Sequence, residues 1–79
     1  MAQVATNLAA ASPGGRNAAL NRAAWTLGRW VVAGVLQQRD VEEVLYAAAE
    51  HNGLVADDGP RQTWAPIRSG LSASLQQAD

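Results

Sequence analysis

Residues 14–34 read GGRNAALNRAAWTLGRWVVAG and contain the longest helical pattern of the chain. The stretch opens on two glycines and closes on Gly34, a residue type suited to the position just after a helix. Trp25, Val32 and Ala18 lie on one side of the helical wheel. A helix that is apolar on nearly all sides is normally buried by several neighbours, so we expect this one to be central. The opposite side carries an apolar stripe at helical spacing, made of Leu20, Ala23, Ala24, Leu27 and Val31.

One further helix is predicted directly on each side of this stretch. A short helical pattern covers residues 2–11, and the breaker Ser12-Pro13-Gly14-Gly15 ends it, with Pro13 disfavouring a helical Ser12. Asn17 is the expected N-cap of the central helix, and Val35 and Leu36 are expected to be buried connectors. The next helix covers about residues 38–51 and ends at Asn52-Gly53.

Two prolines complicate the last helix. Pro60 suits a first helical position after a cap at Asp58 or Gly59. Pro66 would then lie inside the helix, where proline removes a backbone donor and clashes with the previous turn. We therefore expect a short turn at 60–65 and a helix from Pro66 to about Gln76, with Ile67, Leu71 and Leu75 facing the core. The whole pattern predicts an all-α fold, a single domain over residues 1–79 built as a small four-helix orthogonal bundle around the central helix.

Composition limits the size of the core. A chain of 79 residues buries only a modest fraction of its surface. Its 17 Ala and absence of Phe favour closely packed helices, with Trp25, Trp30 and Trp64 expected in the core or an interface. Without Cys there is no disulfide. No apolar run is long enough to span a bilayer and the start does not resemble a signal peptide, so we expect a cytoplasmic protein without a membrane partner.

Charge is distributed unevenly along the chain. Residues 1–39 contain four Arg and no Asp or Glu, a formal +4, whereas residues 40–79 carry a formal −5. Two interpretations are open. The asymmetry can mark a basic surface that binds an anion, or the two halves can neutralise each other across the fold.

No residue pattern points to catalysis. His51 is the only His and lies at a predicted helix end, where a cation is favourable. Asp57 and Asp58 are more typical of a turn and a helix cap than of a metal site. We therefore expect neither an enzyme nor any catalytic residue, metal or cofactor in this chain.

Three local patterns could contact an anion or nucleic acid, and each has a structural alternative. Gly14-Gly15-Arg16-Asn17 could hold a phosphate at a helix start, or could be an ordinary turn. Arg22, Trp25 and Arg29 share one helix face, which suits single-stranded nucleic acid, unless Trp25 is a core residue beside extended arginines. Arg68-Ser69 could contact phosphate, or Arg68 could pair with the acidic third helix.

The segments GGRNAALNRAAWTLGRWVVAGVL, VEEVLYAAAEHNGL and IRSGL, in this order, resemble the primase C-terminal family, in the style of its actinobacterial members. This helical module lies beside primase–polymerase catalytic domains in plasmid, phage and integrated-element replication proteins. The resemblance covers about residues 14–75, and Pro66 departs from it because the family usually carries a good helix former there. The family's recurrent features fall on Gly14 or Gly15, Arg16, Asn17, Leu20, Asn21, Gly34, Ile67, Arg68 and Ser69.

The resemblance implies a non-catalytic accessory domain of a DNA primase/polymerase that contacts template nucleic acid or nucleotide phosphates during replication initiation. The expected partners are single-stranded DNA or primer-template and a primase–polymerase or helicase domain. The alternative is a protein-interaction or oligomerisation module that docks on such a domain or on a second copy. An exposed apolar patch at Trp25 and Val32 favours the alternative. The expected nucleic-acid-binding residues are Arg16, Asn17, Asn21, Arg22, Trp25, Arg29, Arg68 and Ser69.

Overall fold

The computed structural model describes residues 1–11 and 13–76, and these form helices and turns without a strand. The all-α, four-helix expectation is confirmed. The expectation that Pro13 keeps Ser12 out of the first helix lies outside the described residues. The helices are α1 (Ala2–Ala9), α2 (Arg16–Val32), α3 (Gln38–His51) and α4 (Leu54–Gln76), with a 3₁₀ turn, η1 (Pro13–Gly15), before α2.

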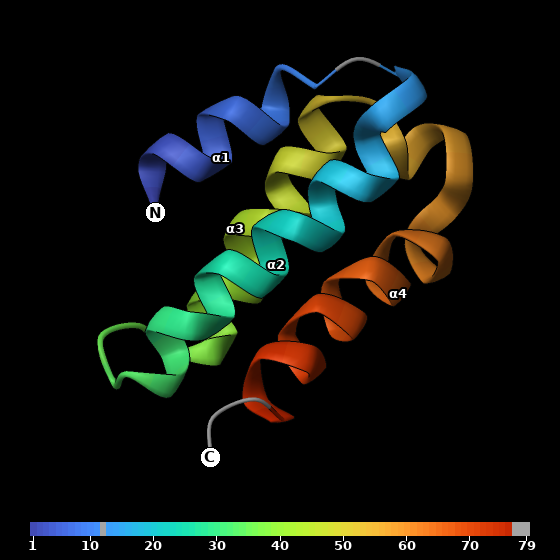
Figure 1. Ribbon diagram of the computed structural model, residues 1–79. Helices are drawn as coiled ribbons and strands as arrows, with labels where there is room; N and C mark the ends of the chain where they lie inside the picture. The colour runs from blue at the N-terminus through green and yellow to red at the C-terminus, as the bar shows by residue number, and fades with distance from the viewer. Residues whose placement is uncertain (12, 77–79) are drawn as a thin grey trace.

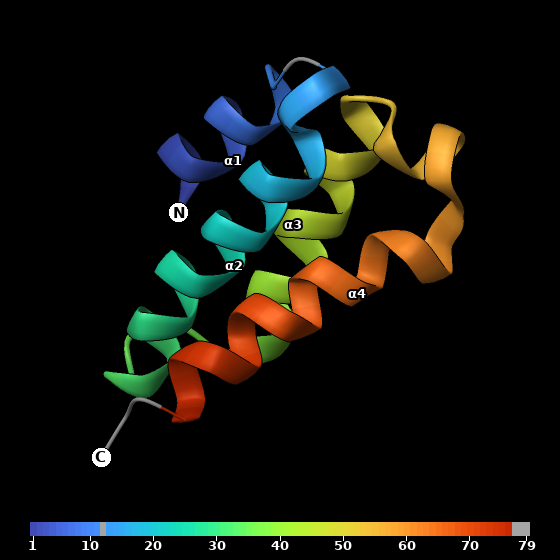
Figure 2. The same ribbon diagram turned by 45° about the vertical axis from the view of Figure 1, so that its right-hand side comes forward.

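Helix α2 packs against α1, α3 and α4, and its contact with α4 is the most extensive of the bundle, in agreement with its predicted central position. Figures 1 and 2 show α3 running back along α2 in the opposite direction, while the long second part of α4 lies beside α2. The largest fully buried apolar side chains come from α2, α3 and α4 and are Leu20, Leu27, Val41, Leu45 and Ile67. None of the helices within residues 1–11 and 13–76 combines the length and apolarity needed to cross a membrane.

Glycines, rather than polar capping side chains, lie at the boundaries of α2 and at the end of α3. Gly34 and Gly53 have φ angles of 79° and 87°, values that favour glycine, and they follow the ends of α2 and α3 as expected. The prediction that Asn17 caps α2 is wrong. Gly15 occupies the N-cap position, and Asn17 lies exposed in the first turn.

The start of the last helix differs from the prediction. Residues 54–58 are already helical, Gly59 alone leaves the helix with φ 85°, and the chain is helical again from Pro60 onward. A helix beginning at Pro66 is therefore wrong. Pro66 is tolerated because it is buried among core residues of α4, and because the preceding turn is secured by Thr63, whose Oγ1 donates to the Gly59 carbonyl at 2.8 Å.

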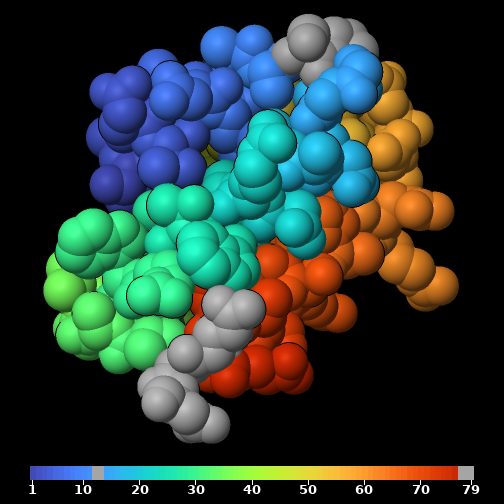
Figure 3. All heavy atoms as spheres, viewed as in Figure 1, coloured from blue at the N-terminus to red at the C-terminus, as the bar shows by residue number. Residues whose placement is uncertain are grey.

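Val35 and Leu75, which the sequence predicts to be buried, are exposed, and so are Trp25 and Trp30, which it assigns to the core or an interface. Trp25, Val35 and Leu75 expose 37%, 63% and 41% of their surface, and Trp30 exposes 50%. For Trp25 and Trp30 the reason is that α1 and α4 pack beside α2 and leave its outer face uncovered, and Figure 3 shows α2 at the surface between them. Val35 lies in the loop after α2, and Leu75 lies in the last turn of α4. Of the three tryptophans only Trp64 is half-buried, where it stacks on Tyr46 with ring centroids 4.8 Å apart.

Candidate functional site

Helices α2 and α4 approach so closely that only glycine fits at the crossing. A Cβ atom on Gly70 would lie 2.4 Å from the backbone oxygen of Asn21 and 2.9 Å from the backbone nitrogen of Trp25. One turn further on, the Ser74 hydroxyl donates a hydrogen bond to the Trp25 carbonyl. This tight contact fixes the position of the α2 side chains relative to α4.

A groove lies next to this crossing, and we call it the α2–α4 groove. It has a volume of about 510 Å³ and opens broadly to solvent. Four of the eight predicted binding residues, Asn17, Asn21, Arg22 and Ser69, line it together. Sequence reasoning missed the rest of its α4 wall, which consists of Gln62, Ala65 and Pro66.

Asn21 links the two walls of the α2–α4 groove. Its Nδ2 donates a hydrogen bond to the carbonyl oxygen of Pro66 at 3.3 Å. Because the carbonyl can only accept, this contact orients the amide and directs Oδ1 away from the bond. The polar groups of α2 therefore meet α4 in a defined arrangement, which a single predicted helix could not reveal.

A basic and aromatic surface runs along the exposed side of α2, and we call it the α2 ridge: Arg22, Trp25, Arg29 and Val32. The guanidinium carbon of Arg29 lies 5.4 Å from the centroid of the Trp25 ring, a cation–π contact. Within residues 1–11 and 13–76 neither Arg22 nor Arg29 has an ion-pair partner. Their charges can therefore interact with an external anion.

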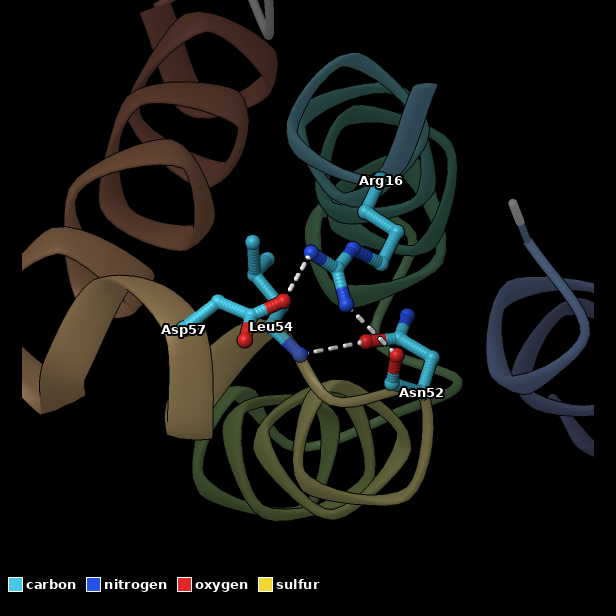
Figure 4. A network of polar contacts seen from close by, with 4 residues as sticks. All are labelled: Arg16, Asn52, Leu54 and Asp57. Carbon is cyan, nitrogen blue, oxygen red and sulfur yellow. Dashed lines mark hydrogen bonds and ion pairs between the residues drawn. The ribbon is translucent and has the colours of Figure 1, made fainter. Parts of the chain in front are cut away.

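Arg16 lies away from this surface. It is buried, and Figure 4 shows its guanidinium between the start of α4 and the turn after α3. Nη1 donates to the Asn52 carbonyl at 2.8 Å, and Nη2 contacts the Asp57 carboxylate at 2.6 Å. In this arrangement Arg16 joins the start of α2 to the start of α4. The Arg16 side chain of the Gly14-Gly15-Arg16-Asn17 segment therefore does not point into the α2–α4 groove.

Asn52 belongs to the same polar cluster. The sequence predicted only that a helix ends at this residue. Its Nδ2 donates to the carbonyl of Leu8 at 3.0 Å, and its Oδ1 accepts from the amide of Leu54 at 3.0 Å. The cluster of Arg16, Asn52 and Asp57 thereby connects the ends or starts of all four helices. The only signal in the sequence was the Asn-Gly pair after α3.

Arg68 and Ser69 point to different surfaces. Successive residues of an α-helix are rotated by about 100°, and here Ser69 lines the α2–α4 groove while Arg68 lies over Trp64, 5.9 Å from the ring centroid. Trp64 stacks on Tyr46 of α3. Of the four arginines expected to bind nucleic acid, only Arg22 and Arg29 therefore lie together on the exposed side of α2.

No metal-binding cluster of three or more His, Asp or Glu occurs in the described part of the chain. His51 is exposed in the last turn of α3, and the Asp57 carboxylate forms an ion pair with Arg16.

Comparison of the chain with known protein families, with curated proteins and with solved structures found no match.

Proposed function

We propose that this chain is a non-catalytic accessory domain of a DNA primase/polymerase that contacts single-stranded template nucleic acid in the cytoplasm. The observation that carries the proposal is the α2 ridge, where the exposed Arg22 and Arg29 flank the partly exposed Trp25. An aromatic ring can stack on an unpaired base while neighbouring arginines contact phosphates. The link to a primase rests on the resemblance of residues 14–75 to the primase C-terminal family.

The surroundings of the α2 ridge support an anionic ligand. The first 39 residues contain no Asp or Glu, so α1 and α2 supply no carboxylate to compete for these arginines. The acidic residues of the described chain belong to α3 and the beginning of α4. Beside the ridge, the groove adds hydrogen-bonding groups from Asn17, Asn21 and Ser69. A strand lying along α2 would meet charge, an aromatic face and polar groups within one continuous surface.

Binding of a labelled single-stranded oligonucleotide, measured by fluorescence anisotropy, tests this proposal. We expect affinity to fall between about 50 and 200 mM salt, because phosphate binding releases counterions. Replacing Arg22 or Arg29 by Gln should weaken binding and lower the salt slope by roughly 0.7 for each phosphate that is no longer neutralised.

Arg39→Gln is the matched control, since it removes the same charge from an exposed position in α3. If Arg39→Gln weakens binding as much as Arg29→Gln, net charge rather than the α2 ridge is responsible. Absence of binding at low salt would refute the proposal.

A second candidate function, docking on a protein domain or on a second copy, is favoured by two observations. Trp25 and Val32 of the α2 ridge expose 37% and 41% of their surface, and an exposed apolar patch at these two residues favours this function. Met1, Trp30, Val35 and Leu36 surround an apolar hollow of about 230 Å³ at the end of α2, which we call the end patch. Trp30 exposes 50% and Val35 63% of its surface there. Exposed apolar side chains gathered in this way are typical of protein-interaction surfaces.

Two tryptophan variants separate these functions. Trp25→Ala should weaken oligonucleotide binding by roughly ten- to a hundredfold, the effect of removing the ring on which one base stacks, without changing association. Trp30→Ala should lower any concentration-dependent association seen by sedimentation velocity, and should leave oligonucleotide binding unchanged. The reverse pattern would exchange the roles of the α2 ridge and the end patch.

A further inference from the structure

Pro66 removes the helical hydrogen-bond donor of one backbone carbonyl in α4. In an α-helix each carbonyl oxygen points towards the amide four residues later, and the residue four after Gln62 is Pro66, which has no N–H. Both residues line the groove. The Gln62 carbonyl therefore lies beside the Pro66 ring without its normal helical donor.

Asn21 adds a second acceptor to the same groove. Its Nδ2 is held by the Pro66 carbonyl, so its Oδ1 is the end of the amide that remains for a ligand. No hydrogen bond to Oδ1 is formed by residues 1–11 or 13–76. Unlike the side chains of Gln62 and Ser69, which rotate, the Gln62 carbonyl is held by the helix backbone and the Asn21 amide is held by its hydrogen bond to Pro66.

We infer that the α2–α4 groove binds an unpaired nucleobase through its exocyclic amino group. This inference rests on the proposed function and specifies its ligand. Two acceptors held in this way match a group that carries two hydrogens, as the amino groups of cytosine, adenine and guanine do. Thymine has no amino group and only one ring N–H, so it leaves one acceptor of the groove unpaired.

Homopolymeric strands of about twelve nucleotides, within the site sizes of small single-strand binders, test the inference by fluorescence anisotropy. Oligo(dC) and oligo(dT) have bases of the same ring size and the same phosphate charge. We expect oligo(dC) to bind roughly three- to tenfold more tightly than oligo(dT), the difference that one satisfied hydrogen bond makes.

Pro66→Ala is the decisive variant, because its restored amide can donate to the Gln62 carbonyl and so occupy that acceptor. Alanine is a strong helix former, so the helix should persist, which circular dichroism checks. We expect the affinity ratio between oligo(dC) and oligo(dT) to fall towards one, with oligo(dT) affinity unchanged. Pro60→Ala is the matched control and should keep the ratio, since Pro60 lies in the first turn after Gly59, outside the groove.

The outcomes separate this inference from the proposed function. No binding of either strand would refute both. Equal binding of the two strands, or a ratio that Pro66→Ala leaves unchanged, would overturn the inference while the proposed function stands. Should Pro66→Ala fail to fold, Asn21→Ala removes the other acceptor and must lower the same ratio.

Discussion

Replacing Gly70 by alanine is expected to destabilise the fold by about 3 kcal/mol or more. The new Cβ atom would lie 2.4 Å from the Asn21 backbone oxygen and 2.7 Å from the Ala24 Cβ, so α2 and α4 must separate to admit it. The better helix propensity of alanine offsets only about 1 kcal/mol. Since a chain of this length has a total stability of roughly 4 to 12 kcal/mol, much of the protein should be unfolded at moderate denaturant. Urea unfolding followed by circular dichroism measures the change.

Gly14→Ala provides the comparison, because a Cβ atom there would have no neighbour within 4 Å. It should unfold at nearly the wild-type urea concentration. A Gly70→Ala protein as stable as wild type would mean that the two helices do not approach as closely as the structure shows. Because the α2–α4 groove is built from both helices, Gly70→Ala should also weaken any ligand bound there.

Replacing Arg16 by alanine is expected to cost about 2 to 4 kcal/mol of unfolding free energy. The substitution empties a buried position and leaves the Asn52 carbonyl without the donor it has at 2.8 Å. Asp57→Asn should cost about 1 kcal/mol or less, because the Asp57 side chain is 62% exposed and water screens its ion pair with Arg16. The same urea measurement compares the two variants.

The difference in unfolding free energy between Arg16→Ala and Asp57→Asn identifies the role of Arg16. Arg22→Ala removes an exposed arginine from the same helix and should change stability by less than about 0.5 kcal/mol. If Asp57→Asn proved as destabilising as Arg16→Ala, the exposed ion pair would dominate over burial. Weaker nucleic-acid binding by Arg16→Ala would not identify a phosphate contact unless the variant were shown to be folded.

Much of the fold could be predicted because it depends on local patterns. Helix α3 has the predicted bounds, Gln38–His51. Gly34 and Gly53 adopt the positive φ angles that their positions after helices required. The predicted start of the last helix at Pro66 is wrong because it depended only on the local cost of a proline inside a helix. The burial of Pro66 and its neighbour Ile67 against the other helices outweighs the absence of one helical hydrogen bond.

The candidate site could be predicted only in part. Arg22, Trp25 and Arg29 share a face because they lie on one helix, and helical spacing alone places them together. Residues from different helices depend on how the helices pack. Ser69 joins Asn21 in the groove, whereas Arg16 is buried against Asp57. A sequence does not state which side of a helix its neighbours will cover.

By itself, the sequence determined the all-α class, the central helix within residues 14–34 and the basic character of one half of the chain. These properties follow from residue spacing and charge, which exist before the chain folds. Only the tertiary structure decided that α2 and α4 meet at Gly70, that Arg16 is enclosed, and that Trp25 stays exposed. Burial and close approach arise from the mutual packing of helices, because a side chain becomes buried only when another element covers it.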